Sequence, residues 1–190
     1  MIPSESTLER DWLILQDFDQ SVERCEEQPV KIEYYDEQGR RRFYTPDLLI
    51  IYNDGKPPLL CEVKYAEDLR KKWKEMKPKI KAGRRYARER GWKFRIFTER
   101  RIRTPFLTNV KFLRHQQCSA PSQENQDVVL NKLRRMRKAT PQRLIESIHR
   151  DPLKRAEVLP IVWYLVASQR ILADLSQPLT MNTPIKTESH

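Results

Sequence analysis

The chain has 190 residues, of which 38% are hydrophobic and 33% are charged, so it can form one packed domain or two small ones. Its three cysteines lie far apart without a Cys-x-x-Cys pair, which argues against a disulfide framework and a zinc site and favours a reducing compartment. The formal net charge is +11, so we expect an anionic partner. The sequence has neither a signal-peptide pattern nor an apolar run long enough for a bilayer, so we expect a soluble, cytoplasmic protein without membrane contact.

The positive charge is concentrated in the middle of the chain. Residues 1–63 carry 7 Lys and Arg against 14 Asp and Glu, whereas residues 64–103 carry 17 against 5. A solvated, lysine-rich helix face would give the same composition, but the local density of cations favours nucleic acid as the partner. The residues that we expect to bind DNA are Lys71, Lys72, Lys74, Lys77, Lys81, Arg84, Arg85 and Arg88.

A helix is expected near the N-terminus, over residues 6–18. Ser6 and Glu9 have the spacing of a capping box, in which the glutamate satisfies the helix N-terminus. Apolar side chains then recur at helical spacing, at Leu8, Trp12 and Leu15.

Three strands are expected to follow this helix. Turn sequences at residues 36–39 and 54–55, each with an acid and a glycine, separate the apolar runs. The expected strands cover residues 30–35, 43–51 and 59–64.

The most informative residues lie at the ends of the last two strands. Strand side chains alternate between faces, so Glu62 and Lys64 project to one face, while Cys61 and Val63 project to the other. A hairpin between the two strands would bring Asp47 to the same place. Two carboxylates and an ammonium predict a Mg²⁺ site for phosphodiester hydrolysis, with the Val63 carbonyl as a further ligand. Lys64 would then hold the attacking water or offset charge on the phosphate.

Each of these residues also has a purely structural interpretation. Glu62 and Lys64 can form an exposed cross-strand pair, and Asp47 can be a simple turn acid after Pro46. For Glu9, the pattern by itself favours the helix cap over a catalytic role.

The segment after Lys64 is expected to be helical over residues 67–90. Pro78 should kink or split this helix, and Gly91 should end it. A short alternating strand over residues 93–97 follows. This order of elements predicts a mixed α/β class, in which helices flank a central mixed sheet.

The last third of the chain predicts a second, smaller and mainly helical unit of winged-helix type. Residues 116–126 are polar and are expected to form a linker, and residues 182–190 are expected to be a disordered tail. The expected elements are helices over residues 127–136, 141–149 and 153–168, and a hairpin that pairs residues 170–173 with 179–181.

Two partners are open for this second unit. It can bind DNA, or it can be a docking surface for a partner protein. The basic residues available for DNA are Lys132, Arg134, Arg135, Arg137 and Lys138.

Separate blocks of the chain, in the same order, resemble the TnsA family, the endonuclease subunits of bacterial cut-and-paste transposases. The resemblance covers nearly the whole chain. The blocks are Ser6–Trp12, Asp17–Asp19, Glu27–Pro29, Tyr44–Asp47, Cys61–Lys64, Leu159–Trp163 and Ala173–Thr180.

This resemblance implies a restriction-endonuclease-like catalytic domain over residues 1–103 and a winged-helix-like domain over residues 104–181. By matching position, Glu9 on the first helix becomes a metal ligand together with Asp47 and Glu62, and Lys64 becomes the catalytic lysine. The implied cofactor is Mg²⁺, as one or two ions, with Mn²⁺ as a substitute.

The resemblance also implies a reaction and partners. The endonuclease cuts the 5′ strands at transposon ends, the DDE-type transposase TnsB cuts and joins the 3′ ends, and the AAA+ ATPase TnsC regulates both. Two alternatives stay open, namely an autonomous restriction or repair nuclease of the same fold, and a catalytically inactive DNA-binding adaptor.

Overall fold

The computed structural model describes residues 4–188, and the chain divides into two compact units between Arg103 and Thr104. The sequence places its domain boundary at the same position. Within residues 4–188, none of the helices combines the length and the apolar composition that a membrane crossing requires.

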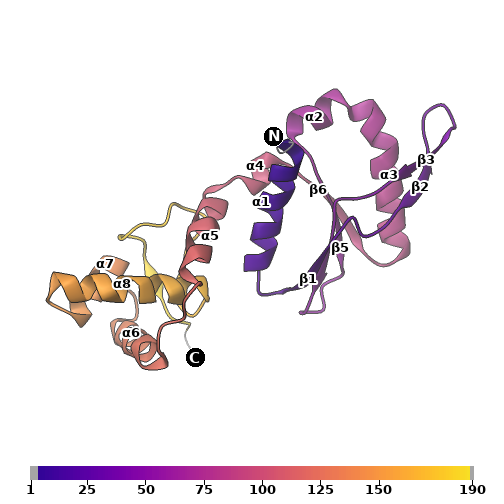
Figure 1. Ribbon diagram of the computed structural model, residues 1–190. Helices are drawn as coiled ribbons and strands as arrows, with labels where there is room; N and C mark the ends of the chain where they lie inside the picture. Colours follow the sequence, from indigo (N-terminus) through magenta and orange to yellow (C-terminus); the bar gives the residue numbers. More distant parts are fainter. Residues whose placement is uncertain (1–3, 189–190) are drawn as a thin grey trace. The chain divides into compact units, whose positions relative to one another are not determined.

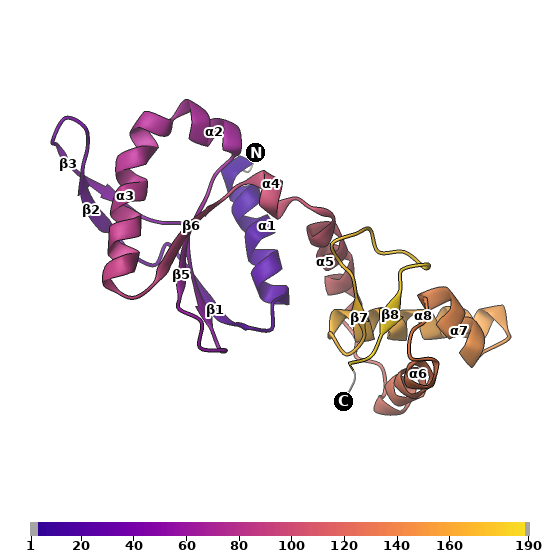
Figure 2. The same cartoon turned by 180° about the vertical axis from the view of Figure 1, so that it is seen from behind.

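The N-terminal unit is built on a four-stranded mixed sheet with strand order β1-β4-β5-β6. The β1–β4 and β4–β5 pairs are antiparallel, and the β5–β6 pair is parallel. Helix α1 lies on one side of the sheet and α3 on the other (Figures 1 and 2). The elements of this unit are α1 (Ser4–Phe18), β1 (Val22–Glu27), β2 (Ile32–Tyr35), β3 (Arg41–Tyr44), β4 (Leu48–Tyr52), β5 (Leu59–Val63), α2 (Ala66–Lys71), α3 (Trp73–Glu89), β6 (Lys93–Phe97) and α4 (Glu99–Ile102).

The predicted hairpin between the two apolar strands is confirmed. Leu48 of β4 pairs with Cys61 of β5, and the backbone N–H of Asp47 donates to the Cys61 carbonyl at 3.1 Å. Asp47 therefore lies directly beside the end of β5 that carries Glu62.

The two faces of the sheet are covered differently. On the α1 side, the Trp12 ring stacks on Phe97 of β6 with 3.9 Å between the ring centroids. On the α3 side, Leu49 and Leu60 join a buried cluster with Ala82 of α3. Because side chains two apart share a face, Asp47 and Glu62 belong to the α3 side.

Strands β2 and β3 form a hairpin of their own, with Gly39 at φ +72° in the turn. The sequence predicted this turn. It did not predict that the hairpin packs against α3 as a separate two-stranded sheet. It also did not predict strand β1. The central sheet therefore contains only two of the three strands expected before residue 65, together with β1 and β6.

The predicted split of the helix at Pro78 is wrong. Helix α3 runs through Pro78, and the interruption lies earlier, at Lys72, which separates α2 from α3. With the break six residues upstream, Pro78 removes a single hydrogen bond near the start of α3, and the helix tolerates it. Gly91 follows the helix end at φ +69°, as predicted.

The predicted capping box is also wrong. Helix α1 begins at Ser4, two residues before the expected cap at Ser6. Glu9 therefore lies in the second turn of the helix rather than beside a cap.

Over its described residues, 104–188, the C-terminal unit is a group of four helices with one short strand pair. Helix α8 packs against α5, α6 and α7. The expected linker over residues 116–126 is shorter, because α5 extends to Gln116 and Ser122 caps α6 by accepting from the N–H of Asn125 at 3.3 Å. The elements are α5 (Pro105–Gln116), α6 (Gln123–Met136), α7 (Pro141–Ile148), α8 (Pro152–Ala167), β7 (Leu172–Ala173) and β8 (Ile185–Lys186).

The predicted hairpin partner is corrected, and so is the predicted disordered tail over residues 182–188; residues 189 and 190 of that prediction lie outside the described part of the chain. Strand β7 pairs with β8 at residues 185–186, not with residues 179–181. Ile185 is fully buried, and its backbone exchanges hydrogen bonds of 2.8 and 3.1 Å with Ala139. A single apolar residue among polar ones gives no periodic signal, so the sequence pattern could not reveal this strand. The winged-helix organisation of the unit stays a prediction.

Candidate active site

Asp47, Glu62 and Lys64 lie together at the end of the sheet where β5 ends. The Lys64 Nζ atom is 4.0 Å from Asp47 Oδ1 and 3.7 Å from Glu62 Oε1. All three side chains are largely shielded from solvent, with 15%, 4% and 17% of the Asp47, Glu62 and Lys64 side chains exposed. The structure therefore brings together the three residues that the strand pattern predicted.

The backbone of β5 fixes the position of Asp47. The Val63 N–H donates to Asp47 Oδ2 at 2.6 Å, and the Asp47 carbonyl accepts from the N–H of Gln28 at 2.9 Å. A strand residue points its N–H and C=O to the same side, so the Val63 carbonyl also faces the side on which Asp47 lies. This placement would let the Val63 carbonyl bind the same metal ion as Asp47.

Glu62 has a carboxyl whose pKa is strongly shifted. Burial raises the pKa of its carboxyl to about 7, and the negative charge of Asp47 acts in the same direction. A hydrogen bond from Tyr44 and the cations Lys64 and Lys79 act in the opposite direction. The raised pKa favours the protonated carboxyl, and a further cation beside it would favour the charged form.

Tyr44 is a site residue that the sequence did not reveal. Its hydroxyl donates to Glu62 Oε2 at 2.5 Å, and the residue is only 6% exposed. Burial and the nearby Glu62 charge raise the pKa of the Tyr44 phenol, so it stays protonated and remains a donor. The available signal was that an aromatic residue with a polar end lies three residues before Asp47.

Glu9 lies in the second turn of α1, and its role as a metal ligand stays a prediction. Thr7 and Asp11, which contact Arg103 at 3.2 and 2.9 Å, share one flank of α1, and Glu9 lies about 200° around the helix from Thr7. Helix α1 covers the face of the sheet opposite to that of Asp47 and Glu62. Searched over residues 4–188, the His, Cys, Asp and Glu side chains include no group of three or more that could hold a metal ion.

The predicted DNA-binding cations all lie on α2 and α3 or at their junction. Lys71 pairs with Glu67 at 2.6 Å, and Arg85 lies 3.9 Å from Glu89. A near-straight row along α3 consists of Lys77, Lys81, Arg84 and Arg88, which are all exposed.

The basic residues of the C-terminal unit lie at the end of α6 and just after it. Arg134 donates to Asn131 at 3.0 Å, and Arg137 has a left-handed backbone at φ +62°. Nothing in this arrangement favours DNA over a protein partner.

Comparison with known protein families gives two adjacent matches. Residues 19–99 match the family described as "TnsA-like endonuclease N terminal", and residues 101–175 match "TnsA endonuclease C terminal". No curated protein matches the chain. The two matches follow each other in the order of one protein and together run from residue 19 to residue 175, and the chain therefore belongs to the TnsA family of transposase endonuclease subunits.

Proposed function

We propose that the chain is a metal-dependent endonuclease that cuts the 5′ strands at transposon ends during cut-and-paste transposition. The observation that carries this proposal is the pair of shielded carboxylates, Asp47 and Glu62, around the Lys64 ammonium. Family membership supplies the substrate class, and this geometry supplies a place for the chemistry.

The donor chemistry of the site fits a Mg²⁺ ion. Mg²⁺ binds proteins through one or two carboxylates and keeps several waters, so it does not require three protein ligands. Asp47, Glu62 and the Val63 carbonyl would hold the ion, with Mn²⁺ as a substitute, and Glu9 would approach from α1. A bound metal supplies polarisation of the scissile phosphate and a bound water of lowered pKa, as one ion or as a pair.

The protein's own residues orient the reactants. The Lys64 ammonium, 3.7 Å from Glu62 Oε1, can hold the attacking water or offset the negative charge that develops on the phosphate. Tyr44 and the Val63 N–H each hold one carboxylate oxygen, so the two acids keep their positions while the substrate changes. The cations of α2 and α3 would bind the DNA backbone nearby.

The assembly that we propose includes DNA, the transposase TnsB and the ATPase TnsC. Family membership supports a transposition system that acts on DNA. Because uncontrolled cutting would damage the host, we propose that the chain cuts only within this assembly. The C-terminal unit would bind DNA or one of these proteins.

Strand-resolved cleavage of transposon-end DNA tests the function. With Mg²⁺ and the partner transposase, the wild-type chain should produce 5′-strand cuts, and Asp47→Asn should lose them. Asparagine keeps an oxygen that accepts from the Val63 N–H, so the fold should persist while the charge is lost. The matched control is Asp54→Asn, in an exposed turn where the acid pairs with Lys56 at 2.5 Å, and this variant should cut normally.

Three other outcomes would reject the proposal. Equal 5′ cutting by Asp47→Asn would remove the site assignment. Cutting without the transposase would favour an autonomous nuclease, and DNA binding without any cut would favour an inactive adaptor.

A further inference from the structure

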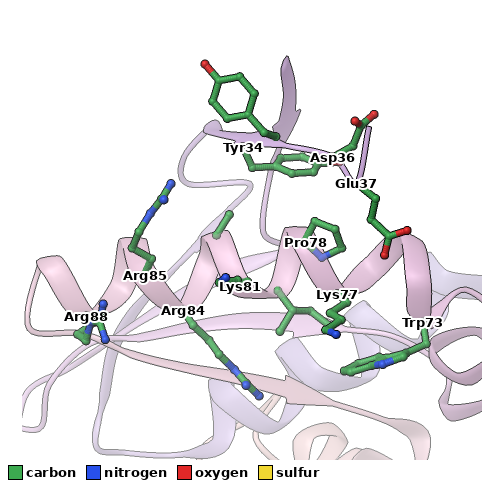
Figure 3. Close-up of a pocket in the computed structure, with 13 residues that line it drawn as sticks. Tyr34, Asp36, Glu37, Trp73, Lys77, Pro78, Lys81, Arg84, Arg85 and Arg88 are labelled. Carbon is green, nitrogen blue, oxygen red and sulfur yellow. The ribbon is translucent and has the colours of Figure 1, made fainter. Parts of the chain in front are cut away.

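Lys79 of α3 is a cation that is not among those expected to bind DNA. Its side chain is 24% exposed, and its Nζ lies 2.9 Å from Oε1 of Glu75, one turn earlier on the helix. The expected DNA-binding cations of α3 lie on another face, where they line a groove beside the hairpin of β2 and β3 (Figure 3). These cations are Lys77, Lys81, Arg84, Arg85 and Arg88, and Lys79 is not part of this lining.

Helix α3 runs antiparallel to β5 and β6 along one face of the sheet. Helix α2 begins at Ala66, just after β5 ends at Val63, and α3 follows α2. The far end of α3 leads into Lys93, which pairs with Leu59 at the opposite end of β5. Residues nearer the N-terminus of α3 therefore lie nearer the end of β5 that carries Glu62.

The close approach of α3 at Gly83 fixes the level of Lys79 along the sheet. A Cβ atom at Gly83 would lie 2.6 Å from Phe94, which pairs with Leu60. Lys79 lies four residues before Gly83, on the same face of the helix and about 6 Å along its axis. Glu62 lies two residues after Leu60, about 7 Å along the strand in the same direction. Lys79 and Glu62 are therefore at the same level, on the α3 side of the sheet.

The positive charge of Lys79 acts at the Glu62 carboxyl. Burial raises the pKa of this carboxyl, and the charges of Lys64 and Lys79 both oppose the rise. Lys64 approaches from the end of β5, and Lys79 approaches from α3. Glu62 is thus near two ammonium groups that come from different elements.

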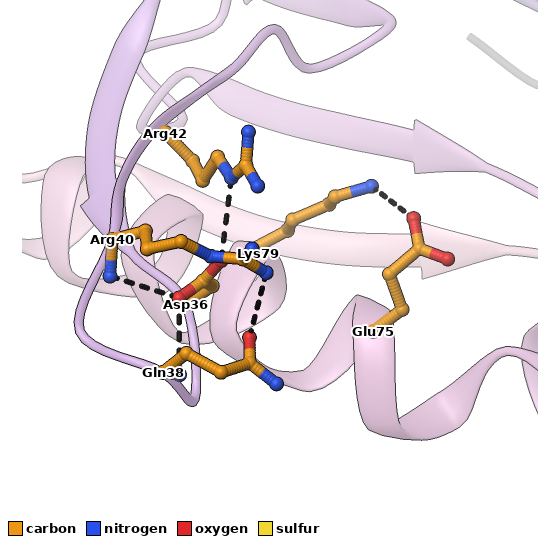
Figure 4. A network of polar contacts seen from close by, with 6 residues as sticks. All are labelled: Asp36, Gln38, Arg40, Arg42, Glu75 and Lys79. Atoms are coloured by element: carbon orange, nitrogen blue, oxygen red, sulfur yellow. Dashed lines mark hydrogen bonds and ion pairs between the residues drawn. The ribbon is translucent and has the colours of Figure 1, made fainter.

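Figure 4 shows how the cations around this position are held. Arg40 and Arg42 of the hairpin both donate to Asp36, at 3.0 and 3.2 Å. Lys79 pairs instead with Glu75, whose side chain is 67% exposed. An exposed ion pair between residues four apart on a helix contributes little to stability, so a phosphate oxygen can replace the Glu75 carboxylate at Lys79.

We propose that Lys79 is a second active-site lysine, which leaves Glu75 when DNA binds and contacts a non-bridging oxygen of the scissile phosphate. There it stabilises the negative charge that develops on the phosphate in the transition state. Lys79 forms no covalent bond and transfers no proton in this role. The inference rests on the proposed function, because it assigns a further residue to the same cutting reaction.

This role differs from attraction of the DNA backbone in what it changes. Loss of a cation that contacts only backbone phosphates weakens binding, and saturating DNA then restores the rate of cutting. Loss of a cation at the reacting phosphate slows the cut even when all of the protein has DNA bound.

The test separates the rate of the cut from the affinity for DNA. Single-turnover 5′-strand cutting is measured with Mg²⁺, the partner transposase and saturating transposon-end DNA, and affinity is measured in EDTA. Lys79→Met keeps the length of the side chain without its charge, and it should cut roughly 100-fold more slowly. It should bind DNA nearly as tightly as wild type. Lys79→Arg keeps the charge and should recover part of the rate.

Two variants control for the loss of an ion pair. Glu75→Gln breaks the same pair as Lys79→Met but keeps the ammonium, so it should cut at least as fast as wild type. Lys56→Met removes a lysine that lies 2.5 Å from Asp54, in the turn at the opposite end of the β4–β5 hairpin. This variant should cut normally.

Three outcomes would overturn the inference. The first is a Lys79→Met chain that cuts at the wild-type rate. The second is an equal loss in Lys79→Met and Glu75→Gln, which would show that the ion pair only supports the helix. The third is a Lys79→Met defect that disappears as more DNA is added, which would show contact with the backbone alone.

The variant at Asp47 separates failure of the inference from failure of the proposed function. If Lys79→Met cuts normally while Asp47→Asn loses the 5′ cut, the inference fails and the proposed function stands. If the wild-type chain makes no 5′ cut, both fail.

Discussion

Glu62 is a residue at which burial and a neighbouring negative charge act in the same direction. It is 3% exposed, and its pKa of about 7 lies well above the ordinary value of 4.5. An acid with a raised pKa in the folded state binds its proton more tightly there than in the unfolded chain. Folding stability is therefore greatest below pH 4.5 for this group and falls as the pH rises toward 7.

The expected size of this effect is about 3 kcal/mol, at 1.36 kcal/mol for each pKa unit. Glu62→Gln has no carboxyl to titrate at this position. In EDTA, the free energy of unfolding of Glu62→Gln minus that of wild type should therefore increase by about 3 kcal/mol between pH 4.5 and pH 8. Urea denaturation at several pH values measures it. A constant difference between the two proteins across this range would show that Glu62 is not strained in the folded state.

The candidate site could be predicted only in part from the sequence. Alternation along the strand placed Glu62 and Lys64 on one face, and the turn at residues 54–55 placed Asp47 beside them. Tyr44 escaped notice because its hydrogen bond joins two strands that are not neighbours in a sheet, and no local pattern encodes such an interaction. Glu9 was proposed from resemblance, and its place on α1 does not decide its role.

At the scale of elements, the packing of α3 on the sheet depends on Gly83. A Cβ atom at this position would lie 2.6 Å from Phe94 Cε2 and 3.1 Å from Tyr44 Cε1. Glycine therefore lets the helix approach the strand face closely, next to the tyrosine that holds Glu62.

Gly83→Ala should destabilise the fold despite the better helix propensity of alanine. Overpacking costs roughly 1–3 kcal/mol, and the gain in propensity of about 1 kcal/mol offsets part of it. Thermal or urea unfolding measures the difference. The control is Arg84→Ala on the exposed face of α3, which should change stability by less than about 0.5 kcal/mol. A Gly83→Ala protein that is more stable than wild type would contradict the close packing.

Elements with strong local signals were predicted well, and those fixed by distant residues were not. The β4–β5 hairpin has apolar runs around an Asp-Gly turn, and it was predicted in the correct pairing. Strand β1 is half exposed and rich in charge, so it lacks both an apolar run and a clear alternation. Strand β8 is two residues long and is fixed by Ala139 and Ala173, which are remote in sequence.

At the scale of the whole molecule, the charge is divided between an acidic first third and a basic segment after it. The cations of α2 and early α3 should contribute to DNA binding as a group. Replacing Lys71, Lys72 and Lys74 by glutamine should reduce the slope of log affinity against log salt by about 2–3 for duplex DNA, at roughly 0.9 for each phosphate that is no longer neutralised. Fluorescence anisotropy over a range of salt concentrations gives this slope.

The matched control replaces three adjacent arginines that all have acidic partners, whereas of the three lysines only Lys71 has one among residues 4–188, in Glu67 at 2.6 Å. Arg40 and Arg42 pair with Asp36, and Arg41 pairs with Glu33 at 2.7 Å. Their replacement by glutamine should change the slope much less. An unchanged slope in the lysine variant would remove α2 and the start of α3 from the DNA-binding surface.

The measurement that tests the account most directly is calorimetric titration of Mn²⁺ into the full chain at pH 6 and pH 8. If Asp47 and Glu62 hold the ion together, wild type should bind more tightly at pH 8. At pH 6 it should release close to one proton for each ion bound, because Glu62 must ionise. Glu62→Gln should bind much more weakly and release no proton. Equal affinity in wild type and Glu62→Gln, or binding without proton release at pH 6, would contradict a cation site between these two carboxylates.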